Sequence, residues 1–320
     1  MAMERPHSRL LRWQAQRGPQ QKWGTRPEDM DMDAVVATCN GMRRWFGSSR
    51  AWFPIHVSGW DNLPAPGNLL VANHSGGTVI PDVWGLGFAW YQQFGRLRPV
   101  HALGHEMVFS LESTARFFAQ RGILRASRDA ARTILTGSGR DLLVLPGGDL
   151  DTWRPWRERY KVNFAGRKGY ARIAIETGAP VVPIAHAGAH DTLIVLSDGE
   201  RVARALHFPE LFRANIFPVH LSFPYGLGIG PWPHIPPPTT LRYRIGRAVL
   251  PPPLRPGQAP TAAQIDDFDI QVRAALQLEL DVLRDEAEGL LDRAEHSMKR
   301  MRGRVSALVR GRSERAQAAR

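Results

Sequence analysis

His74 and Asp82 are the residues whose types and spacing best suit acid–base chemistry in this chain. An apolar run, residues 69–71, leads directly into His74, and a Gly-rich turn then leads to Pro81 and Asp82. Such a run is typical of a buried strand, and proline and a carboxylate are both favoured in the first turn of a helix. We therefore expect His74 at the carboxyl end of a strand, where α/β sheets bind ligands, with Asp82 pointing back toward it. A carboxylate beside an imidazole fixes its tautomer and stabilises its protonated form, as a general base requires.

The same pattern has an ordinary structural interpretation. A histidine that follows a strand often bonds only to the backbone, and a Gly-Gly pair is often only a turn. These residues therefore indicate a catalytic base only if other blocks of the chain support it.

The spacing of apolar residues predicts the elements that must position this pair. Strands alternate with helices, which is typical of a largely parallel sheet covered on both faces. We therefore expect an α/β fold in which helices flank a mostly parallel central sheet, with basic terminal extensions. The expected strands are residues 51–60, 69–71, 99–103, 141–145, 180–185 and 239–250. The expected helices are residues 33–46, 83–94, 107–119, 127–135, 167–177 and 261–298.

Residues 215–238 are apolar but are interrupted repeatedly by proline and glycine. Proline removes a backbone donor, so we expect neither a helix nor a central strand in this segment. The sequence predicts a long irregular surface segment. An exposed apolar loop is either covered by another element of the protein or inserted into another structure.

The charge of the chain lies at its two ends. The sequence has 42 Lys and Arg against 30 Asp and Glu, a net charge of +12. Residues 1–26 carry +5 and residues 299–320 carry +7, so the residues between them are neutral overall. Basic ends on a neutral body favour contact with an anionic membrane surface over nucleic acid, for which no base-reading or stacking motif is present. Solvated tails without any partner are the alternative.

The chain is expected to have three parts: a flexible basic arm (1–30), an α/β domain (31–260), and an amphipathic helix with a basic tail (261–320).

No window has the roughly 20 apolar residues that a membrane-spanning helix needs. Arg and Gln stand near the N-terminus where a signal peptide has its apolar centre. The single Cys39 excludes a disulfide framework and a Cys-based zinc site. We expect a cytoplasmic protein, peripheral at the inner face of the membrane.

Four sequence blocks occur in a fixed order along the middle of the chain. They are Asn73-His74 with Asp82, then residues 122–128 (GILRASR), residues 145–148 (LPGG) and residues 181–184 (VVPI). This set resembles the glycerolipid acyltransferase family, whose lysophosphatidic acid acyltransferases carry a His-x4-Asp block, a Gly-to-Arg block, a Glu-Gly-Thr block and a Val-Pro block. The Pro-Gly-Gly of the third block resembles the branch that contains diacylglycerol-type acyltransferases. The resemblance spans residues 50–250.

The resemblance implies that His74 takes the proton of an acceptor hydroxyl while Asp82 orients the ring. The hydroxyl then attacks an acyl thioester, carried on coenzyme A or an acyl-carrier protein, without an enzyme-bound nucleophile. No Gly-x-Ser-x-Gly elbow is present. The implied partners are the thioester donor, a lipid acceptor such as a lysophospholipid or a diacylglycerol-like alcohol, and an anionic membrane surface; neither a cofactor nor a metal is expected. The implied substrate-binding residues are Asn73, Ser75, Gly76, Gly77, Arg125, Arg128, Pro146, Gly147, Gly148, Asp149 and Lys168.

Two blocks depart from the family pattern. The family Asp lies five positions after the His, where this chain has Val79, whereas Asp82 lies eight positions after it. The turn at residues 75–77 has to loop out the extra residues. Residues 146–149 (PGGD) stand where the family has Glu-Gly-Thr-Arg, and the loss of the Glu and the Arg puts a lysophosphatidate-like acceptor in doubt. Gly-Gly still lets backbone amides approach a phosphate or an oxyanion closely.

Basic residues near these blocks have two interpretations each. Arg128, with Arg125 as its neighbour, aligns with the family Arg that contacts a substrate phosphate, but both also suit the exposed start of a helix. The basic residues between 154 and 168 suit coenzyme A phosphates or a lipid headgroup, or else a solvated face. A thioester or lipid hydrolase and a non-catalytic lipid-binding protein of the same fold are the alternatives to acyl transfer.

Overall fold

The computed structural model describes residues 23–205, 216–232, 234–255 and 257–318, and beyond residue 290 only the course of the backbone. Seven strands form a central sheet in the order β1-β10-β6-β2-β5-β3-β4. Five neighbouring pairs are parallel, and only β10 and β6 are antiparallel. The expected α/β fold with a mostly parallel sheet is confirmed. The strands are β1 (Ile55–Ser58), β2 (Leu69–Ala72), β3 (Val100–Gly104), β4 (Ile123–Arg125), β5 (Asp141–Val144), β6 (Val181–Ala187) and β10 (Leu241–Ile245).

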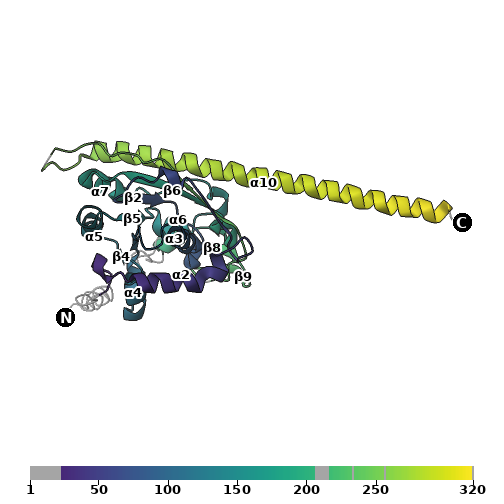
Figure 1. Cartoon of the computed structure of the whole chain (residues 1–320), viewed down its shortest axis with the longest axis horizontal. Helices are drawn as coiled ribbons and strands as arrows, with labels where there is room; N and C mark the ends of the chain where they lie inside the picture. The colour runs from purple at the N-terminus through teal and green to yellow at the C-terminus, as the bar shows by residue number, and fades with distance from the viewer. Residues whose placement is uncertain (1–22, 206–215, 233, 256, 319–320) are drawn as a thin grey trace.

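Helices cover both faces of this sheet (Figure 1). In β2, Leu69 and Val71 belong to the apolar cluster that the sheet shares with α7 and α10. Leu70 and Ala72 point to the opposite cluster, shared with α2 and α3. Successive strand residues face opposite sides, so a strand covered on both sides is apolar throughout, as residues 69–72 are. The helices are α2 (Met32–Phe46), α3 (Pro81–Phe94), α4 (Glu112–Ala119), α5 (Arg128–Arg132), α6 (Gly148–Thr152), α7 (Gly169–Thr177), α8 (Glu200–Ala205) and α10 (Ala262–Ala318).

A second, smaller sheet corrects the prediction for residues 215–238. Its three antiparallel strands are β7 (Ile194–Ser197), β8 (Val219–Ser222) and β9 (Gly226–Ile229). The expectation of an irregular segment without a central strand is wrong, because β8 is the middle strand of this sheet and Pro218 and Pro224 lie outside it. Proline is compatible with a strand when it lies at the strand's ends.

Several local predictions also differ from the structure. β4 was not expected, and the helix expected at 107–119 is divided into a 3-10 turn (Glu106–Phe109) and α4. Most of the basic arm expected at 1–30 falls on residues 1–22, outside the described residues. Within the described part of the chain, no helix combines the length and apolar content needed to cross a bilayer.

Candidate active site

The structure brings His74 and Asp82 together at the carboxyl end of β2. His74 Nδ1 lies 2.6 Å from Asp82 Oδ2. The tautomer that makes this bond has its proton on Nδ1, so Nε2 is left as an acceptor. The imidazole side chain is 13% exposed and the carboxyl side chain only 2%. The pair therefore combines a reachable ring with a buried carboxylate.

The turn after β2 accounts for the longer spacing between the two residues. Gly76 and Gly77 have φ values of 97° and 63°, in the left-handed region that favours glycine. A Cβ atom on Gly77 would lie 2.6 Å from Leu193 Cδ2, so a side chain has no room there. A 3-10 turn follows, and α3 then starts with Asp82 as its second residue. The turn loops out the extra residues and returns Asp82 to the ring.

Asp82 is held in place from several sides. Its Oδ2 also accepts the Ser75 N–H at 2.8 Å, and its backbone oxygen accepts the Tyr243 hydroxyl at 2.7 Å. Burial by itself raises the pKa of the Asp82 carboxyl, but the His74 ring and the Ser75 N–H hold that pKa below its usual value. The position at the start of α3 further favours a negative charge. Asp82 is therefore an ionised partner for the imidazole.

Asn73 and Ser75, on either side of His74, are tied to β6. Asn73 Nδ2 donates to the His186 backbone oxygen at 2.9 Å, and Asn73 Oδ1 accepts the His186 N–H at 2.8 Å. The Ser75 hydroxyl lies 3.0 Å from His186 Nε2. Burial lowers the pKa of His186 to about 4, so this ring is neutral and accepts the Ser75 proton. These contacts lock the backbone on both sides of His74.

The turn at residues 146–149 lies at the end of β5, next to β2 in the sheet. Arg167 Nη1 donates to the Gly147 oxygen at 2.6 Å, and Arg167 Nη2 pairs with Asp149 at 2.8 Å. A Cβ atom on Gly147 would lie 2.3 Å from Asp151 Cβ. Glycine at this position therefore allows α6 to bring Asp151 close to the turn.

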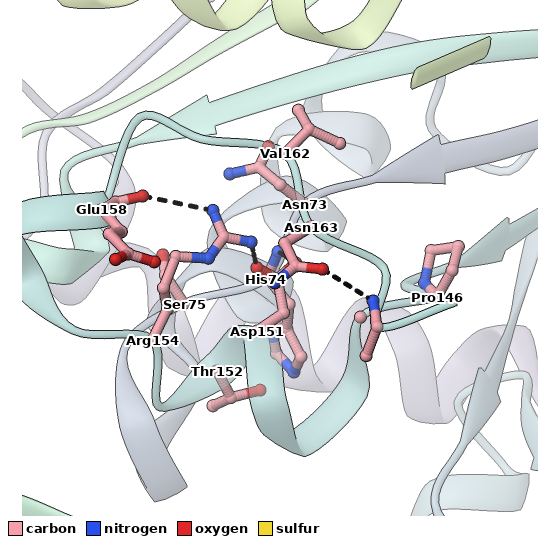
Figure 2. Close-up of polar contacts among 12 residues, drawn as sticks. Asn73, His74, Ser75, Pro146, Asp151, Thr152, Arg154, Glu158, Val162 and Asn163 are labelled. Atoms are coloured by element: carbon pink, nitrogen blue, oxygen red, sulfur yellow. Dashed lines mark hydrogen bonds and ion pairs between the residues drawn. The ribbon is translucent and has the colours of Figure 1, made fainter. Parts of the chain in front are cut away.

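Asp151 is the site residue that the sequence analysis missed. Its Oδ2 accepts the His74 N–H at 2.8 Å, and its other oxygen forms an ion pair with Arg154. Both side chains are buried, and burial lowers the pKa of Arg154 to about 10. Figure 2 shows Asp151 beside His74, with Arg154 between Asp151 and Glu158. The sequence signal for this pair is an Asp three residues after a Gly-Gly turn and three residues before an Arg.

Three predicted binding residues lie away from the pair. Arg125 ends β4, three strands from β2 and so about 14 Å away across the sheet. It forms an ion pair with Glu106. Arg128 is exposed at the start of α5. Lys168 pairs with Asp266 of α10 at 2.8 Å.

An apolar cavity lies beside the site, between α2, α3, α4 and the sheet. Its volume is about 100 Å³, and residues such as Cys39, Leu70, Gly87 and Phe118 line it. A smaller cavity of about 10 Å³ lies against Asp82 and His186. The two cavities share the lining residues Val83, Leu86 and Leu143. The large cavity is therefore separated from the dyad by single side chains.

Comparison with known proteins assigns this region to a family. The family model described as "Acyltransferase" matches residues 54–187, a range that contains His74, Asp82 and Asp151. The chain carries an acyltransferase domain. The expected resemblance to acyltransferases is confirmed over residues 54–187.

Curated relatives resemble the acyltransferase domain at moderate identity. An uncharacterized protein of Mycobacterium leprae is 31% identical over 202 residues, which cover 62% of this chain and 52% of that protein. The "DGAT1/2-independent enzyme synthesizing storage lipids" of Gallus gallus is 27% identical over 180 residues, 56% of this chain and 52% of that protein. The chain thus matches about half the length of each of these relatives.

A solved structure, the 1-acyl-sn-glycerophosphate (LPA) acyltransferase PlsC from Thermotoga maritima, is more remote. It is 15% identical with a TM-score of 0.45, and the match covers 77% of this chain and 78% of that chain.

Proposed function

We propose that this protein transfers a fatty acyl group from a thioester to a hydroxyl of a lipid acceptor, with His74 as general base and Asp82 as its partner. The observation that carries the proposal is the 2.6 Å contact between His74 Nδ1 and Asp82 Oδ2 inside the acyltransferase match. The contact leaves Nε2 free to accept a proton from an alcohol.

The reaction needs one proton transfer in each direction. His74 Nε2 takes the hydroxyl proton as the oxygen attacks the thioester carbonyl carbon, and the Asp82 carboxylate stabilises the imidazolium. The tetrahedral intermediate then breaks its C–S bond, and the leaving thiolate takes the proton from Nε2. One ester bond forms, one thioester bond breaks, and the ring returns to its starting state. A general base of this kind contributes about 10²–10⁴ in rate.

The apolar cavity beside the dyad is the proposed site of the acyl chain. Its walls carry mainly aliphatic and aromatic side chains, which suits a hydrocarbon ligand. The donor is an acyl thioester of coenzyme A or of an acyl-carrier protein, and the acceptor is a lysophospholipid or a diacylglycerol-like alcohol. The Gallus gallus relative, named for synthesizing storage lipids, supports the latter. Arg125, Arg128 and Lys168 are the proposed phosphate contacts. We place the protein in the cytoplasm, at the inner face of the membrane.

Replacing His74 tests the proposal. We expect His74→Ala to lower kcat by about 10²–10⁴ because the proton acceptor is lost. Turnover is measured as acylated lipid formed from an acyl-CoA, with circular dichroism to check the fold. His56→Ala, on the exposed side of β1, is the matched control and should keep full activity.

The products separate acyl transfer from its alternatives. Free fatty acid in place of acylated lipid indicates a hydrolase. Lipid binding without any product from the wild-type protein indicates a non-catalytic binding protein. Undiminished turnover in the His74→Ala variant contradicts the proposed mechanism.

A further inference from the structure

The small sheet has one face packed against the body of the protein. Val195 of β7 and His220 of β8 point inward and are buried. The His220 ring lies 5.3 Å from the Trp153 ring, which connects the sheet to the end of α6. The residues that alternate with Val195 and His220 therefore face outward.

The opposite face of the small sheet is apolar and exposed. The strand register places Ile194, Leu221 and Leu227 in one row across the three strands. Leu196 and Ile229 extend this row along β7 and β9. Phe223 and Tyr225, between β8 and β9, and Trp232 after β9 are 61%, 68% and 68% exposed. We call these eight residues the apolar sheet face.

The apolar sheet face has no charged residue within the segment that carries β8 and β9, whereas Asp198 and Glu200 follow β7. Residues 214–241 contain no Asp, Glu, Lys or Arg. Next to them, Trp52 Nε1 donates to the Pro236 oxygen at 2.7 Å, which attaches residues 43–52 to this region. Arg43, Arg44 and Arg50 are exposed there, and residues 34–60 contain no acidic residue. An uncharged apolar centre thus has a cationic rim on the side where Trp52 contacts Pro236.

The apolar sheet face lies beside the turn that carries His74. Thr78 Oγ1 donates to the Pro231 oxygen at 3.1 Å. A Cβ atom on Gly77 would meet Trp153 and His234 at 3.3 and 3.4 Å. Figure 1 shows α10 extending past the body on the side where β8 and β9 lie. A surface bound to the apolar sheet face would therefore lie close to the candidate active site.

We propose that the apolar sheet face inserts into the interface of an anionic lipid bilayer while Arg43, Arg44 and Arg50 contact the headgroups. Exposed apolar patches of this kind mark interaction sites. Charge complementarity selects the bilayer as the occupant, because an uncharged aromatic centre beside three exposed arginines matches an apolar layer below anionic headgroups. The inference rests on the proposed function insofar as a lipid substrate has to reach His74 from that layer. It assigns membrane contact to this sheet.

Vesicle binding tests the aromatic part of the proposal. The full chain is mixed with phosphatidylcholine vesicles that contain phosphatidylglycerol, and the bound fraction is measured by flotation. We expect Phe223→Ser/Tyr225→Ser/Trp232→Ser to bind about 100-fold more weakly, because three large side chains no longer leave water. The matched control, Leu97→Ser/Leu250→Ser/Leu278→Ser, removes equally exposed side chains elsewhere and should bind like the wild type.

A charge variant tests the rim. Arg43→Gln/Arg44→Gln/Arg50→Gln should lose about fivefold in binding per arginine on vesicles with phosphatidylglycerol and show little change on phosphatidylcholine alone. Arg247→Gln/Arg255→Gln is the control for loss of exposed positive charge.

Two results overturn the proposal. One is undiminished vesicle binding by the Phe223, Tyr225 and Trp232 variant. The other is a light-scattering result in which the wild type is a dimer and this variant is a monomer. The apolar sheet face would then be covered by a second copy of the chain. The vesicle assay requires no turnover, and we expect the His74→Ala variant to bind normally. Failure of the proposed catalysis and failure of the docking surface therefore give different results.

Discussion

At the scale of single residues, the unusual feature is a buried ion pair directly under the candidate base. Asp151 accepts the His74 N–H with one oxygen and pairs with Arg154 through the other. The two side chains are 0% and 3% exposed. Removing one partner of such a pair leaves an uncompensated charge, whereas replacing both partners is often neutral.

This pair predicts a non-additive mutant cycle. We expect Asp151→Asn to lower the free energy of unfolding by about 3–5 kcal/mol, because the Arg154 guanidinium loses its buried counter-charge. The double variant Asp151→Asn/Arg154→Met should recover most of that loss, since an amide still accepts the His74 N–H and no charge remains. Urea unfolding measures both values. Additive effects of the two substitutions would mean that the pair does not act as a unit.

At the scale of elements, α3 connects the dyad to the apolar cavity. Its first turn carries Asp82, and Gly87 lies about one and a half helical turns later, in the cavity wall. A Cβ atom on Gly87 would meet nothing within 4 Å, so this glycine leaves part of the cavity open. By contrast, a Cβ atom on Gly85 would lie 2.5 Å from the Tyr243 hydroxyl. Of these two glycines of α3, Gly87 is therefore the one that tolerates a larger side chain.

Filling the cavity at Gly87 should change acyl-chain preference. We expect Gly87→Leu to lower kcat/KM for long-chain acyl donors by about tenfold and to leave short-chain donors nearly unaffected, because the side chain occupies space that a long chain needs. Competition assays with acyl-CoA mixtures measure the ratio. Gly41→Leu in α2 is the control, since a Cβ atom there also meets nothing within 4 Å. An unchanged ratio in the Gly87 variant would remove the cavity from the acyl path.

The elements also show which parts of the site the sequence can predict. The contact between His74 and Asp82 is local, since one glycine turn and one helix start decide it, and those residues are visible in the sequence. Asp151 lies 77 residues from His74, so its role depends on β5 and β2 being neighbours. The periodicity of apolar residues predicts where strands lie in the sequence but not their order in the sheet. The small sheet was missed for a different reason: proline at strand ends was taken as proline within strands.

At the scale of the whole molecule, α10 packs across one face of the central sheet. Phe268, Leu276 and Leu283 are buried in the cluster that also contains residues of β2 and β6. The sequence predicts this helix from its apolar spacing, but spacing does not say which surface an amphipathic helix covers. That choice depends on the finished sheet, which leaves one face open for α10 and the other for α2 and α3.

Buried histidines make the whole fold sensitive to acid. Burial lowers the pKa of His101, His186 and His234 to about 4 in each case. Histidine in an unfolded chain has a pKa of about 6.5. Between these values the unfolded chain binds more protons than the folded one, so the free energy of unfolding falls as the pH falls from about 6.5 toward about 4. The stability that depends on the neutral rings is fully present above that window.

His101 allows this pH dependence to be measured away from the His74–Asp82 pair. Its Nδ1 lies 3.1 Å from the Gly122 oxygen and its Nε2 3.2 Å from Arg140 Nη1, so the ring is neutral and donates from Nδ1. We expect His101→Asn to reduce the loss of unfolding free energy between about pH 7 and about pH 5 by about 1–2 kcal/mol, although it lowers stability at both values. Urea titrations at the two pH values measure the difference. His56→Asn, on the exposed side of β1, should leave it unchanged. An equal acid loss in the wild type and the His101 variant would exclude this ring as a source, because a site that no longer titrates cannot contribute to the slope.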